Sequence, residues 1–183
     1  MVENDNIIAL ASPSGIGAIS LIRISGPESI QIVNNNFKGI ENISLINQEA
    51  NKVQLGYILD NTNVIDKVLV TVFRNPKSYT GEDLVEISCH GSMFIQQSII
   101  QLLLEENCRI ANAGEFTMRS FLNGKMDLSQ AESVADLISS NSEASHRLAM
   151  NQMRGGFKND INELRIELLN FASLIELELD FSQ

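Results

Sequence analysis

The stretch that decides the fold is residues 78–91, which read Ser-Tyr-Thr-Gly-Glu-Asp-Leu-Val-Glu-Ile-Ser-Cys-His-Gly. A polar turn around Gly81 leads into a segment typical of a β-strand, whose successive side chains point to opposite faces. One face of this strand is apolar, with Val85, Ile87 and Cys89, and the other is polar, with Glu86, Ser88 and His90. The polar face is either an ordinary solvated edge or the wall of a polar pocket.

The segments on either side of this stretch alternate between strand and helix patterns. Residues 53–59 and 64–73 read as a β-hairpin, because two apolar runs flank a polar turn. Pro27 suits the first position of a helix that runs to about Phe37, and residues 93–104 have a helical period. Shorter strands are predicted at 7–11, 18–24 and 108–111, and a loop at 38–51. Strands and helices mixed in this order predict an α/β or α+β domain.

The remainder of the chain carries helical patterns only, which we predict at 115–121, 129–140 and 142–181. In the last of these, an apolar stripe steps by four and three residues alternately, through Phe157, Ile161, Leu164, Leu168, Phe171 and Ile175. Such a stripe packs against a partner helix, and Gly155-Gly156 is expected to interrupt the run. We therefore predict an α+β fold in two parts, an α/β domain over 1–118 and an incomplete all-α bundle over 119–183.

The composition limits the function. Hydrophobic residues make up 44% and charged residues 20% of the 183 residues, as in globular proteins. The formal net charge of −10 argues against nucleic-acid binding by this chain alone, since such modules are usually basic. No run approaches the roughly 20 apolar residues of a membrane helix, and the acidic start is unlike a signal peptide. We expect a soluble, cytoplasmic protein without membrane contact.

Arg23 lies in an otherwise apolar strand. An unpaired buried charge is costly, so its guanidinium must reach solvent, a carboxylate or an anionic ligand. Glu86 presents the same problem with the opposite charge. The two side chains form either a structural ion pair on neighbouring strands or two parts of one polar pocket. In a third interpretation, Arg23 lies at a strand end and its guanidinium reaches water.

Other motifs that suggest chemistry do not meet its requirements. Residues 12–17 precede a strand, so they lack the helix N-terminus of a phosphate loop and predict a tight turn. Residues 123–127 lack the pattern G-x-x-x-x-G-K-[ST], which leaves no ATP or GTP site in this chain and makes Lys125 a solvated turn residue on pattern alone. Cys89 and His90 point to opposite faces and cannot form a catalytic dyad. With Cys89 and Cys108 as the only cysteines, we predict no catalytic residue, no disulfide and no metal site.

Several segments together resemble one protein family. They are residues 9–19 with Arg23-Ile24-Ser25-Gly26, residues 78–91, Gly114-Glu115-Phe116-Thr117, residues 121–128 and Gln130-Ala131-Glu132. Their order and spacing are similar to the N-terminal portion of the tRNA-modification GTPases called MnmE or TrmE, from about Ile7 to Phe181.

This resemblance implies an architecture. Family members have an α/β N-terminal domain similar to folate-dependent aminomethyltransferases, and a helical domain into which a GTPase domain is inserted. The chain would then be the N-terminal domain and the first part of the helical domain of a GTP-hydrolysing enzyme. GTP, Mg²⁺ and K⁺ would bind the GTPase domain, which is absent here together with the cysteine-bearing C-terminal tail.

The resemblance also implies a ligand and partners. The ligand is a tetrahydrofolate derivative, 5-formyl- or 5,10-methylene-tetrahydrofolate, which donates a carbon for 5-carboxymethylaminomethyl-type modification of the tRNA wobble uridine. The folate-contacting positions of the family fall on Arg23, Glu86 and Lys125. The partners are a second copy bound through the N-terminal domain, a flavin-containing subunit of the GidA or MnmG type, and tRNA contacted by the full complex.

Two other readings remain open. In the first, the chain is a dimerisation and scaffold module in which Arg23 and Glu86 form a structural pair. In the second, it is a stand-alone folate-dependent transferase, against which the unpaired apolar stripe argues.

Overall fold

The computed structural model describes residues 5–41 and 43–180, and the side chains at 157–160 and 177–180 are not described. The chain divides into two compact units, Met1–Lys125 and Met126–Gln183. The boundary that we expected after residue 118 falls inside helix α3, Glu115–Leu122, whose Arg119 and Ser120 are buried within the first unit.

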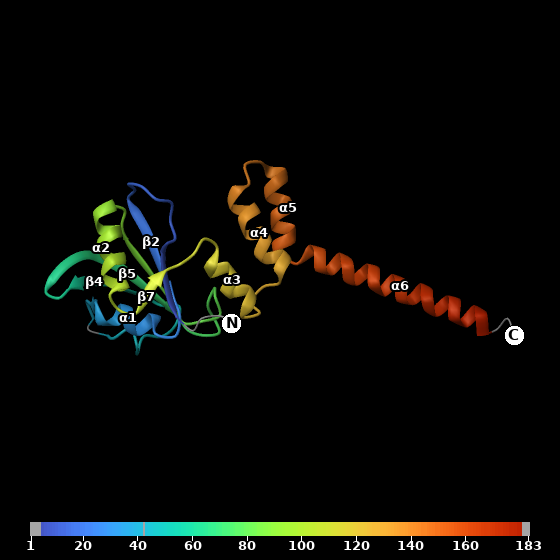
Figure 1. The fold of residues 1–183 in the computed structure, drawn as a ribbon, viewed down its shortest axis with the longest axis horizontal. Coiled ribbons are helices and arrows are strands. Elements are labelled where there is room, and N and C mark those ends of the chain that lie inside the picture. Colours follow the sequence, from blue (N-terminus) through green and yellow to red (C-terminus); the bar gives the residue numbers. More distant parts are fainter. Residues whose placement is uncertain (1–4, 42, 181–183) are drawn as a thin grey trace. The chain divides into compact units, whose positions relative to one another are not determined.

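The first unit is built on one mixed sheet of seven strands in the order β3-β4-β5-β6-β2-β1-β7. Figure 1 labels four of these strands, β2, β4, β5 and β7. Its strands are β1 Asn6–Leu10, β2 Ile19–Ser25, β3 Phe37–Gly39, β4 Val53–Asp60, β5 Asn63–Phe73, β6 Leu84–His90 and β7 Cys108–Ile110. Among the described strands, β7 runs parallel to its neighbour β1, and the other neighbouring strands are antiparallel. The predicted α+β class is confirmed, as are the hairpin of β4 and β5 and the strand that opens after Gly81.

One face of the sheet carries the hydrophobic core. Alternate residues of the central strands, among them Ile22, Val70 and Ile87, are buried on this face. Helices α1, Ser29–Asn35, and α2, Met93–Leu104, cover it with Ile30, Val33, Ile99 and Leu103. Cys89 is 4% exposed and belongs to this core, as its place on the apolar face predicts.

The opposite face of the sheet is not covered by these helices. It carries Arg23 and Glu86, which alternate along their strands with the buried residues. Several apolar side chains on this face are exposed: Ile19, Val53, Leu55 and Leu69. The strand 84–90 is therefore apolar towards the core and polar towards an open face.

Two details differ from the sequence-based expectation. The first helix begins at Ser29, after Pro27, and ends at Asn35. Phe37, the predicted end of that helix, instead starts β3, which pairs with β4 and extends into the predicted loop. The short strand has no alternating pattern of its own and depends on its partner, since Gly56 leaves the space that the Phe37 ring fills.

The second unit consists of helices α4, Leu128–Ser139, α5, Glu143–Met153, and α6, Gly156–Asp180 (Figure 1). Capping boxes at Asp127 and Ser142 fix the starts of α4 and α5. The predicted interruption is confirmed, because Arg154 ends α5 and Gly155 has a φ of +79°. The apolar stripe lies on α6 with Ile161, Leu164, Leu168, Phe171 and Ile175 exposed, whereas the Phe157 side chain and Phe181 lie outside the described residues.

No helix in the described part of the chain is both long enough and apolar enough to cross a membrane.

Candidate functional site

Arg23 and Glu86 meet on the open face of the sheet. They are direct partners in the antiparallel register of β2 and β6. Arg23 donates to Glu86 Oε1 from Nε at 2.9 Å and from Nη2 at 2.6 Å. Both side chains remain about a fifth exposed, at 23% and 22%. The expectation that they lie on neighbouring strands is correct. The interpretation in which Arg23 reaches only water is excluded, because Arg23 bonds Glu86.

The pair does not use all of its hydrogen-bonding atoms. In the described part of the chain, neither Arg23 Nη1 nor Glu86 Oε2 takes part in a hydrogen bond. A guanidinium nitrogen carries only donors, and a carboxylate oxygen only accepts. The pair therefore presents an unused donor beside an unused acceptor on a partly exposed surface.

Two aromatic rings lie against the Arg23 guanidinium. Its carbon is 5.0 Å from the ring centre of Tyr79 and 5.6 Å from that of Phe116, within the range of cation–π attraction. The hydroxyl of Tyr79 also bonds Thr117 Oγ1 at 2.9 Å, which joins the ring to α3. Sequence reasoning missed both rings, because their contact with Arg23 arises only in the folded chain. Phe116, however, lies in a segment that carries the family resemblance.

Lys125 lies in the turn after α3, as predicted, and is exposed. Its Nζ donates to the carbonyl oxygen of Pro76 at 3.0 Å. A Cβ at Gly81, which has a φ of +80°, would lie 3.2 Å from Lys125 Cγ, so the lysine stem packs against this glycine. Among the described residues Lys125 makes no hydrogen bond or ion pair with Arg23 or Glu86. The three predicted site residues are thus one contacting pair and one cation held by the loop that leads into β6.

A cluster of charged side chains includes Glu82, which lies in the loop that leads into β6. Arg119 of α3 is 1% exposed and contacts the carboxylates of Asp5, Glu82 and Glu115 at 2.5, 3.2 and 3.1 Å. Arg109 contacts Asp5 and Glu115, each at 2.6 Å. Sequence reasoning did not find the cluster, although the spacing of Glu115 and Arg119 at i and i+4 on a helix is a signal for one of its pairs.

The contacts within the cluster favour the charged forms of Glu115, Asp5 and Arg119. Hydrogen bonds from Arg109 lower the pKa of Glu115 from 4.5 to about 2, against the opposing effect of burial. Burial raises the pKa of Asp5, but hydrogen bonds from Arg119 and Arg109 outweigh it and the net pKa is lowered. Burial likewise disfavours the charged form of Arg119, yet its three carboxylate partners raise the pKa overall.

The remaining candidate groups are structural. The buried Cys89 thiol donates to Ser20 O at 3.6 Å, and burial raises the pKa of Cys89 to about 11. His90 contacts Asp66 Oδ1 through Nδ1 at 2.7 Å and does not face Cys89. Burial similarly raises the pKa of Cys108 to about 11. Neither thiol has the depressed pKa of a reactive cysteine.

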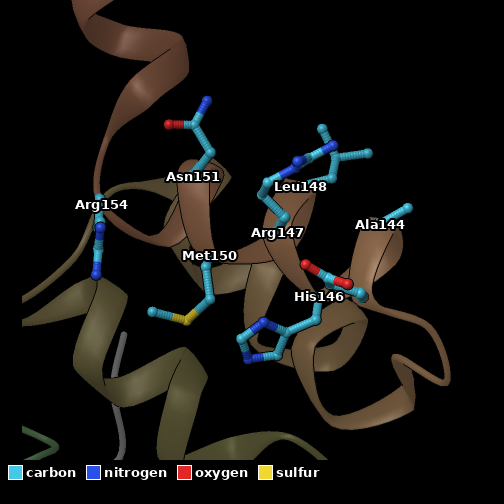
Figure 2. A pocket seen from close by; sticks show the side chains of 8 residues that line it. Ala144, His146, Arg147, Leu148, Met150, Asn151 and Arg154 are labelled. Atoms are coloured by element: carbon cyan, nitrogen blue, oxygen red, sulfur yellow. The ribbon is translucent and has the colours of Figure 1, made fainter.

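One recess lies along α5 and is open to solvent. It measures about 840 Å³ and is lined by the residues Glu143, Ala144, His146, Arg147, Leu148, Met150, Asn151 and Arg154. All of them belong to α5 or directly follow it, and their side chains point in different directions (Figure 2). Among the described side chains, nothing from another element lines this recess opposite α5, as a site that buries a ligand would require.

The structure is therefore an α+β domain with an open arginine–carboxylate pair on its sheet, joined to a unit of three helices. Two family models match it: the N-terminus of the GTP-binding protein TrmE over residues 6–125, and the MnmE helical domain over residues 128–183. The chain belongs to the MnmE/TrmE family.

Curated relatives agree along the whole chain. Over 183 residues it is 64% identical to the tRNA modification GTPase MnmE of Flavobacterium johnsoniae, 62% to that of Christiangramia forsetii and 55% to that of Bacteroides thetaiotaomicron. Each match covers 100% of this chain and 39% of the relative. The chain thus spans about two fifths of the length of these proteins.

Proposed function

We propose that this chain binds a tetrahydrofolate one-carbon donor and dimerises, as part of a tRNA-modification GTPase that acts on the wobble uridine. The observation that carries the proposal is the Arg23–Glu86 pair, which keeps one donor nitrogen and one acceptor oxygen unused on an open face.

The spare atoms match the edge of a pterin ring. Such an edge presents an amino group and a ring N–H beside a carbonyl oxygen. Glu86 Oε2 is a suitable acceptor for the N–H groups, and Arg23 Nη1 is a suitable donor for the carbonyl. Since Glu86 Oε1 already accepts from Arg23, this carboxylate has one oxygen left for the ligand.

Lys125 would supply a positive charge for an anionic part of the folate, such as its glutamate tail. Its ammonium has one contact, with the carbonyl oxygen of Pro76, and is otherwise exposed. The bound folate would supply the carbon that is transferred. GTP, Mg²⁺ and K⁺ would bind the GTPase domain of the complete enzyme, and the flavin-containing GidA or MnmG subunit and tRNA would join it in the cytoplasm.

Dimerisation is supported by the open face of the sheet. Leu55 and Leu69 are neighbours across β4 and β5 and are 40% and 45% exposed, and Ile19 and Val53 are exposed on the same face. Two copies related by a two-fold axis would bury the same patch on each other.

The experiment is calorimetric titration of 5-formyltetrahydrofolate into the 183-residue chain, with its mass measured by sedimentation equilibrium. We expect a dimer that binds the folate. Glu86→Gln should weaken binding by about tenfold or more, because it removes a charge-assisted hydrogen bond. The control Glu49→Gln makes the same charge change in the exposed Lys52 pair and should bind like the wild type. A folded wild-type chain that releases no heat would refute folate binding, and a monomer at high concentration would refute dimerisation.

A second candidate is the scaffold module without a ligand, which the short contacts of the Arg23–Glu86 pair favour. It predicts that Arg23→Ala/Glu86→Ala changes stability while the wild type binds no folate. The titration above separates the two candidates.

A further inference from the structure

Arg119 stands out among the buried groups that the proposed folate site does not use. Its side chain is 1% exposed, yet its guanidinium is joined to three carboxylates and to the backbone oxygen of Asp5. Arg109 lies in the same cluster but contacts only Asp5 and Glu115 among the carboxylates. Arg119 thus differs from Arg109, which is 37% exposed, in its burial and in its contact with Glu82.

Glu82 links Arg119 to the strand and the loop that carry the site. While Arg119 contacts both of its oxygens at 3.2 and 3.3 Å, Glu82 Oε2 accepts from Ser25 Oγ at 2.8 Å. The Ser25 hydroxyl lies 2.7 Å from Thr80 Oγ1. Ser25 follows Arg23 by two residues on β2, and Thr80 directly follows Tyr79. The Arg119 guanidinium is thus connected through Glu82 to Ser25 and Thr80. Ser25 lies near Arg23 on β2, and Thr80 adjoins Tyr79, whose ring lies against Arg23.

Helix α3 holds the same loop at two further points. Ser120 Oγ donates to Tyr79 O at 2.7 Å, and Asn123 Nδ2 donates to Thr80 O at 2.8 Å. Residues of α3 and Asn123, which directly follows it, therefore contact Tyr79, Thr80 and Glu82 of residues 78–83. We call residues 78–83 the Tyr79 segment.

We propose that Arg119 is a positioning residue for the folate site. Through Glu82 it holds the Tyr79 segment so that the Tyr79 ring lies against the Arg23 guanidinium. Because the ring and Glu86 Oε1 fix the plane of that guanidinium, its unused Nη1 is held in one direction. This role rests on the proposed function, since it assigns Arg119 to the orientation of the same site.

The tyrosines offer a direct measurement of this position. The chain has no tryptophan and two tyrosines, Tyr57 and Tyr79. In a Tyr57→Phe background, fluorescence of Tyr79 therefore reports on the Tyr79 segment alone. Its quenching by acrylamide measures how far the ring is released from its half-buried place against Arg23.

The test compares Arg119→Met, Glu82→Gln and the matched control Arg109→Met in this background, within the 183-residue chain. Arg109→Met breaks two ion pairs of the same cluster without touching Glu82. We expect Arg119→Met and Glu82→Gln to raise Tyr79 quenching about twofold or more. They should also weaken 5-formyltetrahydrofolate binding about tenfold, as for coupled members of one hydrogen-bond network. Arg109→Met should change neither, although it lowers stability.

If Arg119→Met does not fold, Glu82→Gln still tests the positioning role, because it removes the charge of this side chain while preserving its size. Unchanged Tyr79 quenching in Glu82→Gln would overturn the positioning role. So would changes in quenching and folate affinity in Arg109→Met that equal those in Arg119→Met and Glu82→Gln. If the wild type binds no folate, the proposed function fails, whereas the quenching comparison still tests whether Arg119 and Glu82 position Tyr79.

Discussion

The Arg23–Glu86 pair and the Arg119 cluster are both contacts of arginine with carboxylates in the same unit, and they differ in two respects. Arg119 is 1% exposed and contacts three carboxylates. Arg23 is 23% exposed, contacts one carboxylate, and leaves Nη1 unused among the described residues. Burial with several partners is typical of a structural group, whereas the remaining hydrogen-bonding atoms of an exposed pair can bond water or a ligand. Residue type alone does not separate the two.

The buried cluster also stabilises the charge of one of its carboxylates, that of Glu115. Within the cluster, Arg109 first of all and then Asn112 and Arg119 stabilise the Glu115 carboxylate and lower its pKa to about 2. Removing one partner from such a buried group leaves an uncompensated charge, which costs far more than loss of a surface pair. The comparison therefore predicts that a substitution in the buried cluster lowers stability far more than the equivalent substitution in the Arg23–Glu86 pair.

The largest expected effect is on stability. Arg119→Met should lower the free energy of unfolding by about 3–5 kcal/mol, because it leaves buried carboxylates without their partner. Arg23→Met should lower it by about 1 kcal/mol or less, as for a partly exposed pair. Urea denaturation at neutral pH measures both. Equal losses for the two variants would show that the Arg23–Glu86 pair is also structural.

The second effect is the acid sensitivity of the cluster. The pKa of Glu115 is lower in the folded chain, at about 2, than its ordinary value of 4.5, so ionisation of this carboxylate stabilises the fold. This contribution is complete above about pH 4.5 and disappears as the pH falls towards 2. At pH 7 it is on the order of 3 kcal/mol.

Urea denaturation of wild type and Glu115→Gln across this range checks the expectation. The difference between them should be largest at neutral pH and shrink below about pH 4.5, where the wild type loses its advantage. Glu105→Gln, at the exposed end of α2, serves as the control. A difference that stays constant down to pH 2 would contradict ion pairing as its cause.

The fold was largely predictable because its central elements carry strong local patterns. The alternation in residues 84–90 predicts which side of β6 faces the core, and the adjacent strands follow the same period of two. β3 was missed because three residues are too few for a pattern, and its pairing with β4 depends on the space at Gly56. Local periodicity therefore identifies long elements, whereas short ones depend on their partners.

The site was predictable only in part. The cost of an isolated charge in an apolar strand singles out Arg23, and alternation singles out Glu86, although their direct register needed the fold. The cluster around Arg119 has no comparable signal, since Asp5 lies 114 positions before its partner. Pairings over such separations are fixed by the sheet and helix packing and leave almost no trace in local sequence.

The smallest expected effect concerns Lys125, which shares features with both arginines. Like Arg23 it is accessible, but its ammonium donates to a backbone oxygen, that of Pro76. Lys125→Met should therefore change the free energy of unfolding by less than about 0.5 kcal/mol, as for exposed side chains. It should weaken 5-formyltetrahydrofolate binding about threefold to tenfold, because a partly solvated charge contributes less than a paired one. Lys77→Met, an exposed lysine beside Pro76, is the matched control for loss of charge near the loop. If both lysine variants weakened binding equally, Lys125 would act through the general potential of the loop, and the ligand contacts would be confined to the Arg23–Glu86 pair.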